Sequence, residues 1–127
     1  MKILLAEDDF ATRKFMSKFL EQYGDCDIAV DGMEAVDAFL MALESDEGYD
    51  LVCLDVMMPV MGGLEAAQNI RKMDRPDAKT VAMIAMSANA FHDDVEQSLA
   101  AGMNVHMAKP LDFDKLLATI KEYCDKN

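Results

Sequence analysis

Short apolar segments alternate with helical apolar patterns along the whole chain, and this alternation limits the folds that the chain can adopt. The predicted strands cover residues 3–6, 26–30, 51–54, 81–86 and 105–108. Each is followed by a segment in which apolar residues recur every three or four positions, as in an amphipathic helix. Strict alternation of strands and helices builds a parallel sheet with helices on both faces. We therefore expect an α/β fold of five strand–helix units.

The polarity of the strands predicts their order in the sheet. The segments at 3–6, 51–54 and 81–86 are continuously apolar, which is typical of central strands buried on both faces. The segments at 26–30 and 105–108 contain Asp27 and His106, so we expect them at the edges. This pattern agrees with a flavodoxin-like, three-layer (βα)5 sandwich whose strands run in the order 2-1-3-4-5. Ligands of such folds bind beyond the carboxyl ends of the strands.

Composition excludes several classes of function. The 127 residues suggest a single domain, and 24 acidic against 12 basic residues give a net charge of −12. A chain this acidic is not expected to bind nucleic acid directly. No apolar run approaches the ~20 residues that span a membrane, so we expect no membrane insertion. The three cysteines include no C-x-x-C pair, which favours a reducing cytoplasm over a disulfide framework or zinc site.

Polar residues whose side chains could take part in a reaction follow four of the five predicted strands. The first strand is followed by Glu7, Asp8 and Asp9, the third by Asp55, the fourth by Ser87, and the fifth by Lys109. Because the carboxyl ends of parallel strands meet at one edge of the sheet, these side chains are expected to converge. Each alone has an ordinary explanation as a helix cap, loop hydroxyl or solvated side chain. Their shared position instead favours a functional site.

Packed carboxylates predict a metal ion. Two unit charges ~4 Å apart interact by about 4 kcal/mol at an effective dielectric near 20, so Glu7, Asp8 and Asp55 would repel strongly without a cation. Oxygen ligands with few carboxylates favour Mg²⁺, and the sequence contains no Ca²⁺-binding loop motif. Asp55 could then attack phosphorus as a nucleophile. Mg²⁺ and Lys109 would neutralise the phosphoryl oxygens, and Ser87 would donate a hydrogen bond.

The chain resembles the receiver domains of response regulators in two-component signalling, which are similar to the bacterial chemotaxis regulator. The resemblance rests on the acidic segment Leu4–Asp9, the segment Leu54–Gly63 around Asp55, Met86–Ala88 with its hydroxyl, and Ala108–Pro110. It covers nearly all of residues 1–127, which are expected to form one receiver domain. The stretch Ala101–Pro110 is most similar to receivers of hybrid histidine kinases.

The resemblance implies a role for each site residue. Asp8 would bind Mg²⁺ directly, Glu7 through water, and Met57 through its backbone carbonyl, together with the phosphoacceptor Asp55. Asp9 would begin the first helix. Met57 and Asn89, each two residues beyond a site residue, would flank the hydrolytic water and tune the lifetime of the phosphoryl group. The Lys109–Pro110 peptide bond is expected to be cis.

The resemblance also implies a switch and its partners. Ser87 and His106 would form the switch, with His106 moving to a more buried rotamer and altering the surface of the fourth helix, fifth strand and fifth helix. The same surface could form a phosphorylation-dependent dimer. The phosphoryl donor would be a histidine kinase or a histidine phosphotransfer domain. The domain would not be an enzyme, although it would assist its own phosphorylation and dephosphorylation.

Competing functions do not fit the residues at these positions. A haloacid-dehalogenase phosphatase needs a second aspartate two residues after the nucleophile, where Met57 stands. A flavodoxin-like flavin binder needs a phosphate-cradling loop after the first strand, and Glu7 and Asp8 would repel a phosphate there. A receiver that has lost phosphorylation would lack Asp8, Asp55 or Lys109, and all three are present.

Overall fold

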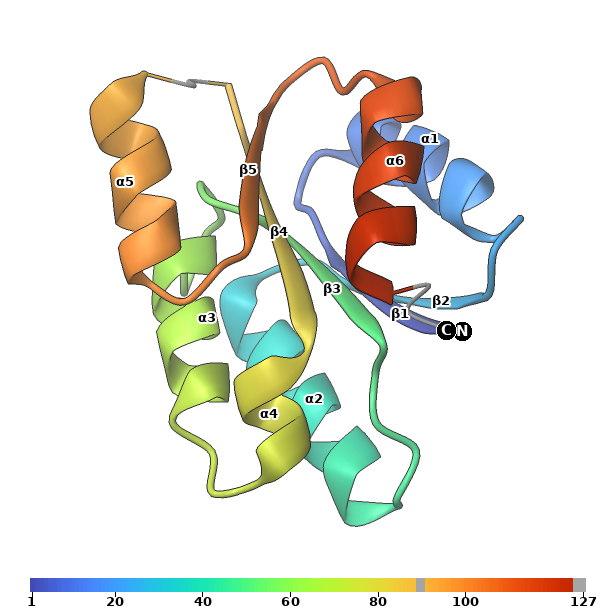
Figure 1. Ribbon diagram of the computed structural model, residues 1–127, viewed down its shortest axis with the longest axis vertical. Coiled ribbons are helices and arrows are strands. Elements are labelled where there is room, and N and C mark those ends of the chain that lie inside the picture. Colours follow the sequence, from blue (N-terminus) through green and yellow to red (C-terminus); the bar gives the residue numbers. More distant parts are fainter. Residues whose placement is uncertain (89–90, 125–127) are drawn as a thin grey trace.

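The computed structural model describes residues 1–88 and 91–124 as five strands and six helices, which alternate except that α4 follows α3 directly (Figure 1). The elements are β1 (Lys2–Ala6), α1 (Phe10–Leu20), β2 (Asp25–Ala29), α2 (Gly32–Glu44), β3 (Leu51–Asp55), α3 (Gly63–Arg71), α4 (Pro76–Thr80), β4 (Ala82–Ser87), α5 (His92–Ala100), β5 (Val105–Ala108) and α6 (Phe113–Cys124). Among these described residues, no helix is long and apolar enough to cross a membrane.

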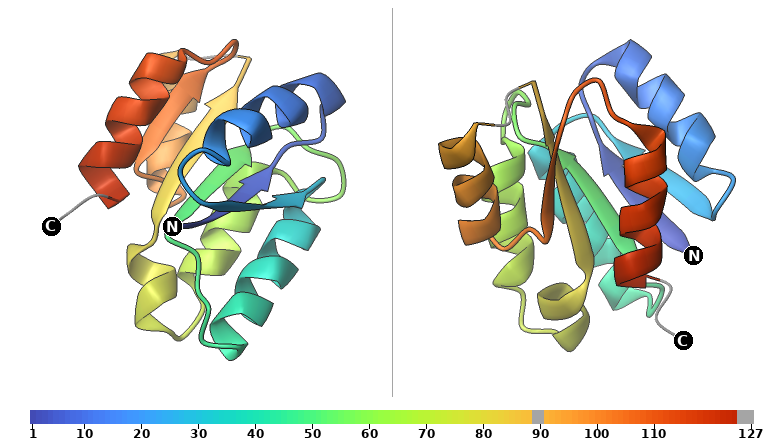
Figure 2. Two further views of the ribbon diagram at one scale, coloured as in Figure 1. Left: turned by 90° about the vertical axis from the view of Figure 1, so that its right-hand side faces the viewer. Right: turned by 45° about the horizontal axis from the view of Figure 1, so that its top comes forward.

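All five strands are parallel and lie in the order β2-β1-β3-β4-β5, which confirms the predicted topology. The central strands β1, β3 and β4 are almost entirely buried, whereas β2 and β5 at the edges carry exposed or half-buried residues. Figure 2 shows the resulting twisted sheet between two layers of helices. The chain is thus a flavodoxin-like α/β sandwich.

Two separate hydrophobic cores fill the spaces above and below the sheet. Successive residues of a strand point to opposite faces. Leu4 of β1 therefore packs with Phe39 of α2 and Ile70 of α3, while its neighbour Leu5 packs with α1 and α6, including Leu116. Burying the central strands on both faces fixes their register, because a slip of one residue would exchange the two cores.

The short helix α4 is absent from the predicted pattern of one helix after each strand. Its five residues are too few to show a helical period, but Pro76 occupies its first turn, where proline is favoured. Asp77 adds an acidic residue to that turn, and the Thr80 hydroxyl donates to the carbonyl of Pro76. The helix lies at the amino end of β4, and Val81, predicted as strand, connects the two.

Candidate functional site

Strand register brings the predicted site residues to one end of the sheet. Ala6 pairs with Leu54, so Glu7, directly after β1, lies beside Asp55, the last residue of β3. Asp55 in turn pairs with Met86, which precedes Ser87. Ser87 pairs with Ala108, so Lys109 follows directly, and its N–H donates to the Ser87 carbonyl at 2.7 Å. The convergence predicted from the sequence is therefore present.

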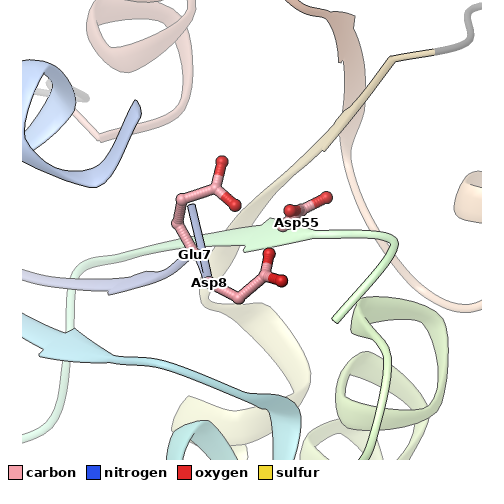
Figure 3. A group of neighbouring side chains, drawn as sticks. All are labelled: Glu7, Asp8 and Asp55. Carbon is pink, nitrogen blue, oxygen red and sulfur yellow. The ribbon is translucent and has the colours of Figure 1, made fainter. Parts of the chain in front are cut away.

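Three carboxylates form the centre of this site. Oxygen atoms of Glu7, Asp8 and Asp55 all lie within 4.8 Å of one another, at the ends of β1 and β3 (Figure 3). Glu7 is fully buried and Asp55 is 4% exposed, whereas Asp8 is exposed to solvent. The cluster is therefore partly enclosed by protein and open on the side of Asp8.

Lys109 is the ammonium group that faces this cluster. Its Nζ donates to Oδ2 of Asp55 at 3.0 Å and forms an ion pair with Oε1 of Glu7. The other oxygen of Asp55, Oδ1, accepts a hydrogen bond from the Met57 N–H at 3.1 Å. Burial alone would lower the pKa of Lys109, but its hydrogen bonds to Glu7 and Asp55 outweigh burial and raise it. Lys109 therefore remains charged beside Asp55.

The charges of the cluster suit a divalent cation. When ionised, the three carboxylates exceed the single Lys109 charge by two negative charges. The guanidinium of Arg13 is nearby, but it donates to the backbone carbonyls of Glu7 and Asp8 and so holds the loop. Carboxylate oxygens open to water on one side are the ligands that Mg²⁺ prefers. The residues present therefore fit a Mg²⁺ site.

Asp9 belongs to helix α1 and not to the carboxylate cluster. Its Oδ2 accepts hydrogen bonds from the backbone N–H of Thr12 at 2.9 Å and from the Thr12 hydroxyl at 2.7 Å. These bonds lower the pKa of Asp9. An aspartate that caps a helix in this way satisfies an otherwise unpaired N–H of the first turn, as predicted.

Burial of Glu7 beside Asp55 predicts a pH dependence for the metal-free protein. Burial, together with Asp55, raises the pKa of Glu7 from 4.5 to about 7 although Lys109 opposes this. Between pH 4.5 and about 7 the folded state binds more protons than the unfolded chain, so the free energy of unfolding falls as the pH rises. In urea denaturation with a chelator, the native protein should lose up to about 3 kcal/mol relative to Glu7→Gln as pH rises from about 4.5 to about 7. A constant difference between the two proteins would contradict this.

The proposed switch residues are hydrogen-bonded to each other. Ser87 Oγ lies 2.8 Å from Nε2 of His106, and the other ring nitrogen, Nδ1, lies 2.7 Å from Oγ of Ser98 on α5. Ser87 and Ser98 are buried, and His106 is half-buried. The predicted movement of His106 between two rotamers involves a second state and stays a prediction.

Ser98, a hydrogen-bond partner of His106, was not predicted from the sequence. The apolar residues that predicted helix α5, Val95 and Leu99, are half-buried and 48% exposed, whereas Ser98 between them is 1% exposed. A buried polar residue inside a helical pattern gives little signal until its hydrogen-bond partner is known. Of the other predicted residues, Met57 is exposed beside Asp55, and Asn89 lies outside the described residues. The Lys109–Pro110 bond is cis, as expected.

A doubly wound sheet that gathers carboxylates, a hydroxyl and an ammonium at its carboxyl end defines a class of small α/β domain suited to phosphoryl chemistry. Comparison with known protein families identifies one family of this class. The response regulator receiver domain profile matches residues 3–121. The chain belongs to this family, the receiver domains of two-component systems, which is consistent with a phosphoacceptor role.

Relatives and solved structures agree with this assignment. Probable histidine kinase 2 of Oryza sativa subsp. indica is 32% identical over 134 residues, which cover 98% of this chain and 13% of that protein. The chain therefore spans only a small part of such relatives, which also include hybrid signal transduction histidine kinases of Dictyostelium discoideum.

Two solved receivers are similar over nearly the whole chain. The receiver domain of sensor histidine kinase PA1611 from Pseudomonas aeruginosa, solved with magnesium in its active-site cleft, is 28% identical with a TM-score of 0.84, covering 98% of both chains. The receiver of Ssk1 from Saccharomyces cerevisiae, crystallised with the histidine phosphotransfer protein Ypd1, is 25% identical with a TM-score of 0.83, covering 98% of this chain and 89% of that one.

Proposed function

We propose that this chain is a single receiver domain that accepts a phosphoryl group on Asp55 in a Mg²⁺-dependent reaction. The observation that carries the proposal is the environment of Asp55. Its carboxylate is buried, lies within 4.8 Å of two further carboxylates, and accepts a hydrogen bond from Lys109 at 3.0 Å. A carboxylate nucleophile with a nearby cation is what phosphoryl transfer to aspartate requires.

Each residue of the site has a defined role in the transfer. Hydrogen bonds from Met57 N–H and Lys109 orient the two oxygens of Asp55, and the ammonium also neutralises charge that develops on the phosphoryl oxygens. Ser87, at the end of the adjacent strand, donates a hydrogen bond to the transferred group. Glu7, Asp8, Asp55 and the Met57 carbonyl would hold Mg²⁺. When bound, this ion supplies further positive charge beside the phosphoryl oxygens.

We propose a histidine kinase or a histidine phosphotransfer domain as the phosphoryl donor. The co-crystal of the Ssk1 receiver with Ypd1 supports this class of partner. Large apolar side chains on the loops that follow the strands, or on the first turn of α1, are also exposed, namely Phe10, Met57, Val60 and Phe91. Val60 in addition adopts a left-handed backbone conformation (φ 66°), which is unfavourable for a β-branched residue. Exposed apolar groups around an acidic pocket suit docking of another protein.

Phosphorylation of Asp55 would also change a surface of the domain away from the site. We propose that Ser87 and His106 transmit the change to the surface of α5, β5 and α6, which correspond to the predicted fourth helix, fifth strand and fifth helix. This surface could also form a phosphorylation-dependent dimer. The domain assists its own phosphorylation and dephosphorylation but turns over no separate substrate. The three cysteines form no disulfide within the described part of the chain, which supports the proposed cytoplasmic location.

Acetyl phosphate provides the direct test of the proposed function. Incubation of the native protein with acetyl phosphate and Mg²⁺ should add the mass of one phosphoryl group, measured on the intact protein. The same incubation with a chelator should leave the mass unchanged, because the oxygens of the incoming group would lack the divalent charge. A native protein that gains no mass, or gains it equally without Mg²⁺, would contradict the proposal.

A second prediction concerns the lifetime of the phosphoryl group. Met57 is exposed beside Asp55 and cannot orient a hydrolytic water by hydrogen bonding. We expect the native protein to lose its phosphoryl group more slowly, by on the order of tenfold, than the double variant Met57→Asn/Asn89→Glu, whose polar groups could position that water. Decay of the phosphorylated mass over time, followed side by side, measures this. Equal decay rates would show that these positions do not tune the lifetime.

A further inference from the structure

Arg71, the last residue of α3, joins three separate segments of the chain through its guanidinium group. Its Nε donates to the carbonyl of Gly102 at 2.9 Å, and its terminal nitrogens donate to the carbonyl of Ala78 on α4 at 3.1 Å and to Oδ1 of Asn104 at 3.3 Å. A guanidinium is planar and presents its donors in a fixed geometry, so these three acceptors are held relative to one another. We call this set of contacts the Arg71 clamp.

The turn that receives the guanidinium is itself bonded to the sheet. Oδ1 of Asn104 also accepts the N–H of Met83 at 2.8 Å, and the N–H of Asn104 donates to the carbonyl of Met83 at 2.9 Å. The turn after α5 is therefore fixed to the buried strand β4. Gly102 has a φ of 104°, and a Cβ at this position would lie 2.8 Å from Cγ of Arg71. Glycine is thus required both for this backbone conformation and for the close approach of Arg71.

Helix α5 is anchored unevenly along its length. It follows β4, so it begins at the end of the sheet that carries the carboxylate cluster and ends next to the clamp, farther from that end (Figure 1). Its buried side chains lie at or beyond its last turn, where Ser98, Ala101 and Met103 are at most 4% exposed. The side chains of residues 91–97 are all exposed or half-buried. A segment with few buried contacts is held weakly, so the amino-terminal half of α5 is the part that can move.

We propose that the Arg71 clamp is the fixed point about which α5 turns when Asp55 is phosphorylated, so that the amino-terminal end of the helix is displaced while its carboxyl-terminal end stays in place. This inference rests on the proposed function of Asp55. Moving residues 101–104 would break hydrogen bonds from a charged, half-buried donor, which are about twice as strong as those between neutral groups. Moving residues 91–97 disturbs no buried side chain of that segment. Residues at the end of an element commonly serve as hinges in this way.

The clamp also limits the surface that phosphorylation can change. Arg71 connects the end of α5 to α3 and α4, and Nζ of Lys79 on α4 donates in turn to the Arg71 carbonyl at 3.0 Å. These segments therefore form one rigid unit with the central sheet. A partner that distinguishes the two states is expected to contact the beginning of α5, where Phe91 is 72% exposed, and not α3 or α4.

Distances between spin labels test the fixed point. In a Cys26→Ser/Cys124→Ser background, one label is attached to Lys18→Cys on α1 and the second to Asp93→Cys or Ala100→Cys near the two ends of α5. With Mg²⁺ and beryllofluoride, a mimic of the phosphoryl group, the distance to position 93 should shift and the distance to position 100 should not. Equal shifts at both positions, a shift at position 100 alone, or no shift at either would overturn the inference.

Substitution of Arg71 tests whether the clamp holds the end of the helix. Arg71→Lys keeps the positive charge but has no planar fork with which to hold three separated acceptors, and Arg71→Gln also removes the charge. In both variants the distance to position 100 should now shift with beryllofluoride. Arg75→Lys is the matched control, because Arg75 contacts Leu43 and Asp46 instead, and it should behave like the native protein. A position 100 that stays fixed in both Arg71 variants would overturn the inference.

Amide hydrogen exchange tests the clamp without phosphorylation. The N–H groups of residues 102–104 all donate to backbone carbonyls. In Arg71→Lys their exchange should accelerate by on the order of tenfold, because the lost hydrogen bonds weaken this turn locally, while residues 93–97 keep their native rates. Equal acceleration along the whole chain would show that Arg71 contributes only to overall stability, and the inference would be wrong. This result does not depend on Asp55. If beryllofluoride shifts no amide signal around Asp55 in the native protein, the phosphoacceptor proposal fails and this inference fails with it.

Discussion

Asp55→Asn should abolish phosphorylation by acetyl phosphate completely. An amide has no negative oxygen with which to attack phosphorus, and no other carboxylate of the cluster has the same position. Asp8 is exposed, and Glu7 is held by Lys109 at Oε1 and by the Asp9 N–H at Oε2, at the end of a different strand. Intact-mass measurement after incubation with acetyl phosphate and Mg²⁺ should therefore show only the unmodified protein.

The matched control for this variant is Asp9→Asn. It makes the same chemical change two residues from Glu7, and asparagine can still cap helix α1. We expect Asp9→Asn to gain one phosphoryl group like the native protein. Residual phosphorylation of Asp55→Asn on another carboxylate, identified by peptide mapping, would show that the acceptor had been assigned to the wrong residue.

Mg²⁺ should stabilise the native protein strongly. An ion that binds the folded carboxylate cluster and not the unfolded chain adds about 2.7 kcal/mol at 100 times its dissociation constant. For a chain of 127 residues this raises the thermal midpoint by about 10 °C. Asp8→Ala removes one of the three carboxylates, so the midpoint of this variant should no longer respond to Mg²⁺. Without Mg²⁺, the variant should be at least as stable as the native protein, because one repulsive charge is gone.

Thermal melts at constant ionic strength provide the measurement. Potassium chloride should replace MgCl₂ in the reference sample, so that general screening of the net charge of −12 is the same in both. Asp9→Asn again serves as the control, since it removes a neighbouring charge and should keep the full response. If the native midpoint is indifferent to Mg²⁺, or Asp8→Ala responds as strongly as the native protein, the metal site is wrong.

The sequence predicted the sheet and the position of the site for the same physical reason. Strands buried on both faces must be continuously apolar, so the contrast between residues 51–54 and the segment around Asp27 revealed which strands are central. Once the order was known, parallel strands left no choice about where Asp55, Ser87 and Lys109 meet. These inferences use patterns that repeat over several residues and depend little on exact geometry.

Features that depend on one contact could not be predicted in this way. Helix α4 is shorter than two turns and depends on Pro76 and on packing of Ala78 against the core. The partnership between Ser98 and His106 depends on how far α5 lies from β5, which neither segment encodes alone. The ion pair between Lys109 and Glu7 likewise joins residues about a hundred positions apart. Such contacts follow from the assembled fold.

The position of α4 has a consequence for protein engineering. It extends the connection before β4 at the end of the sheet opposite the carboxylate cluster (Figure 1), while the strands keep their register. Segments inserted between Met73 and Val81, such as a peptide tag or a fluorescent reporter, would therefore emerge far from Asp55. The same insertion between Asp55 and Gly63 would displace the Met57 N–H that orients the acceptor. The amino-terminal end of this sheet is the one to use for building sensors from the domain.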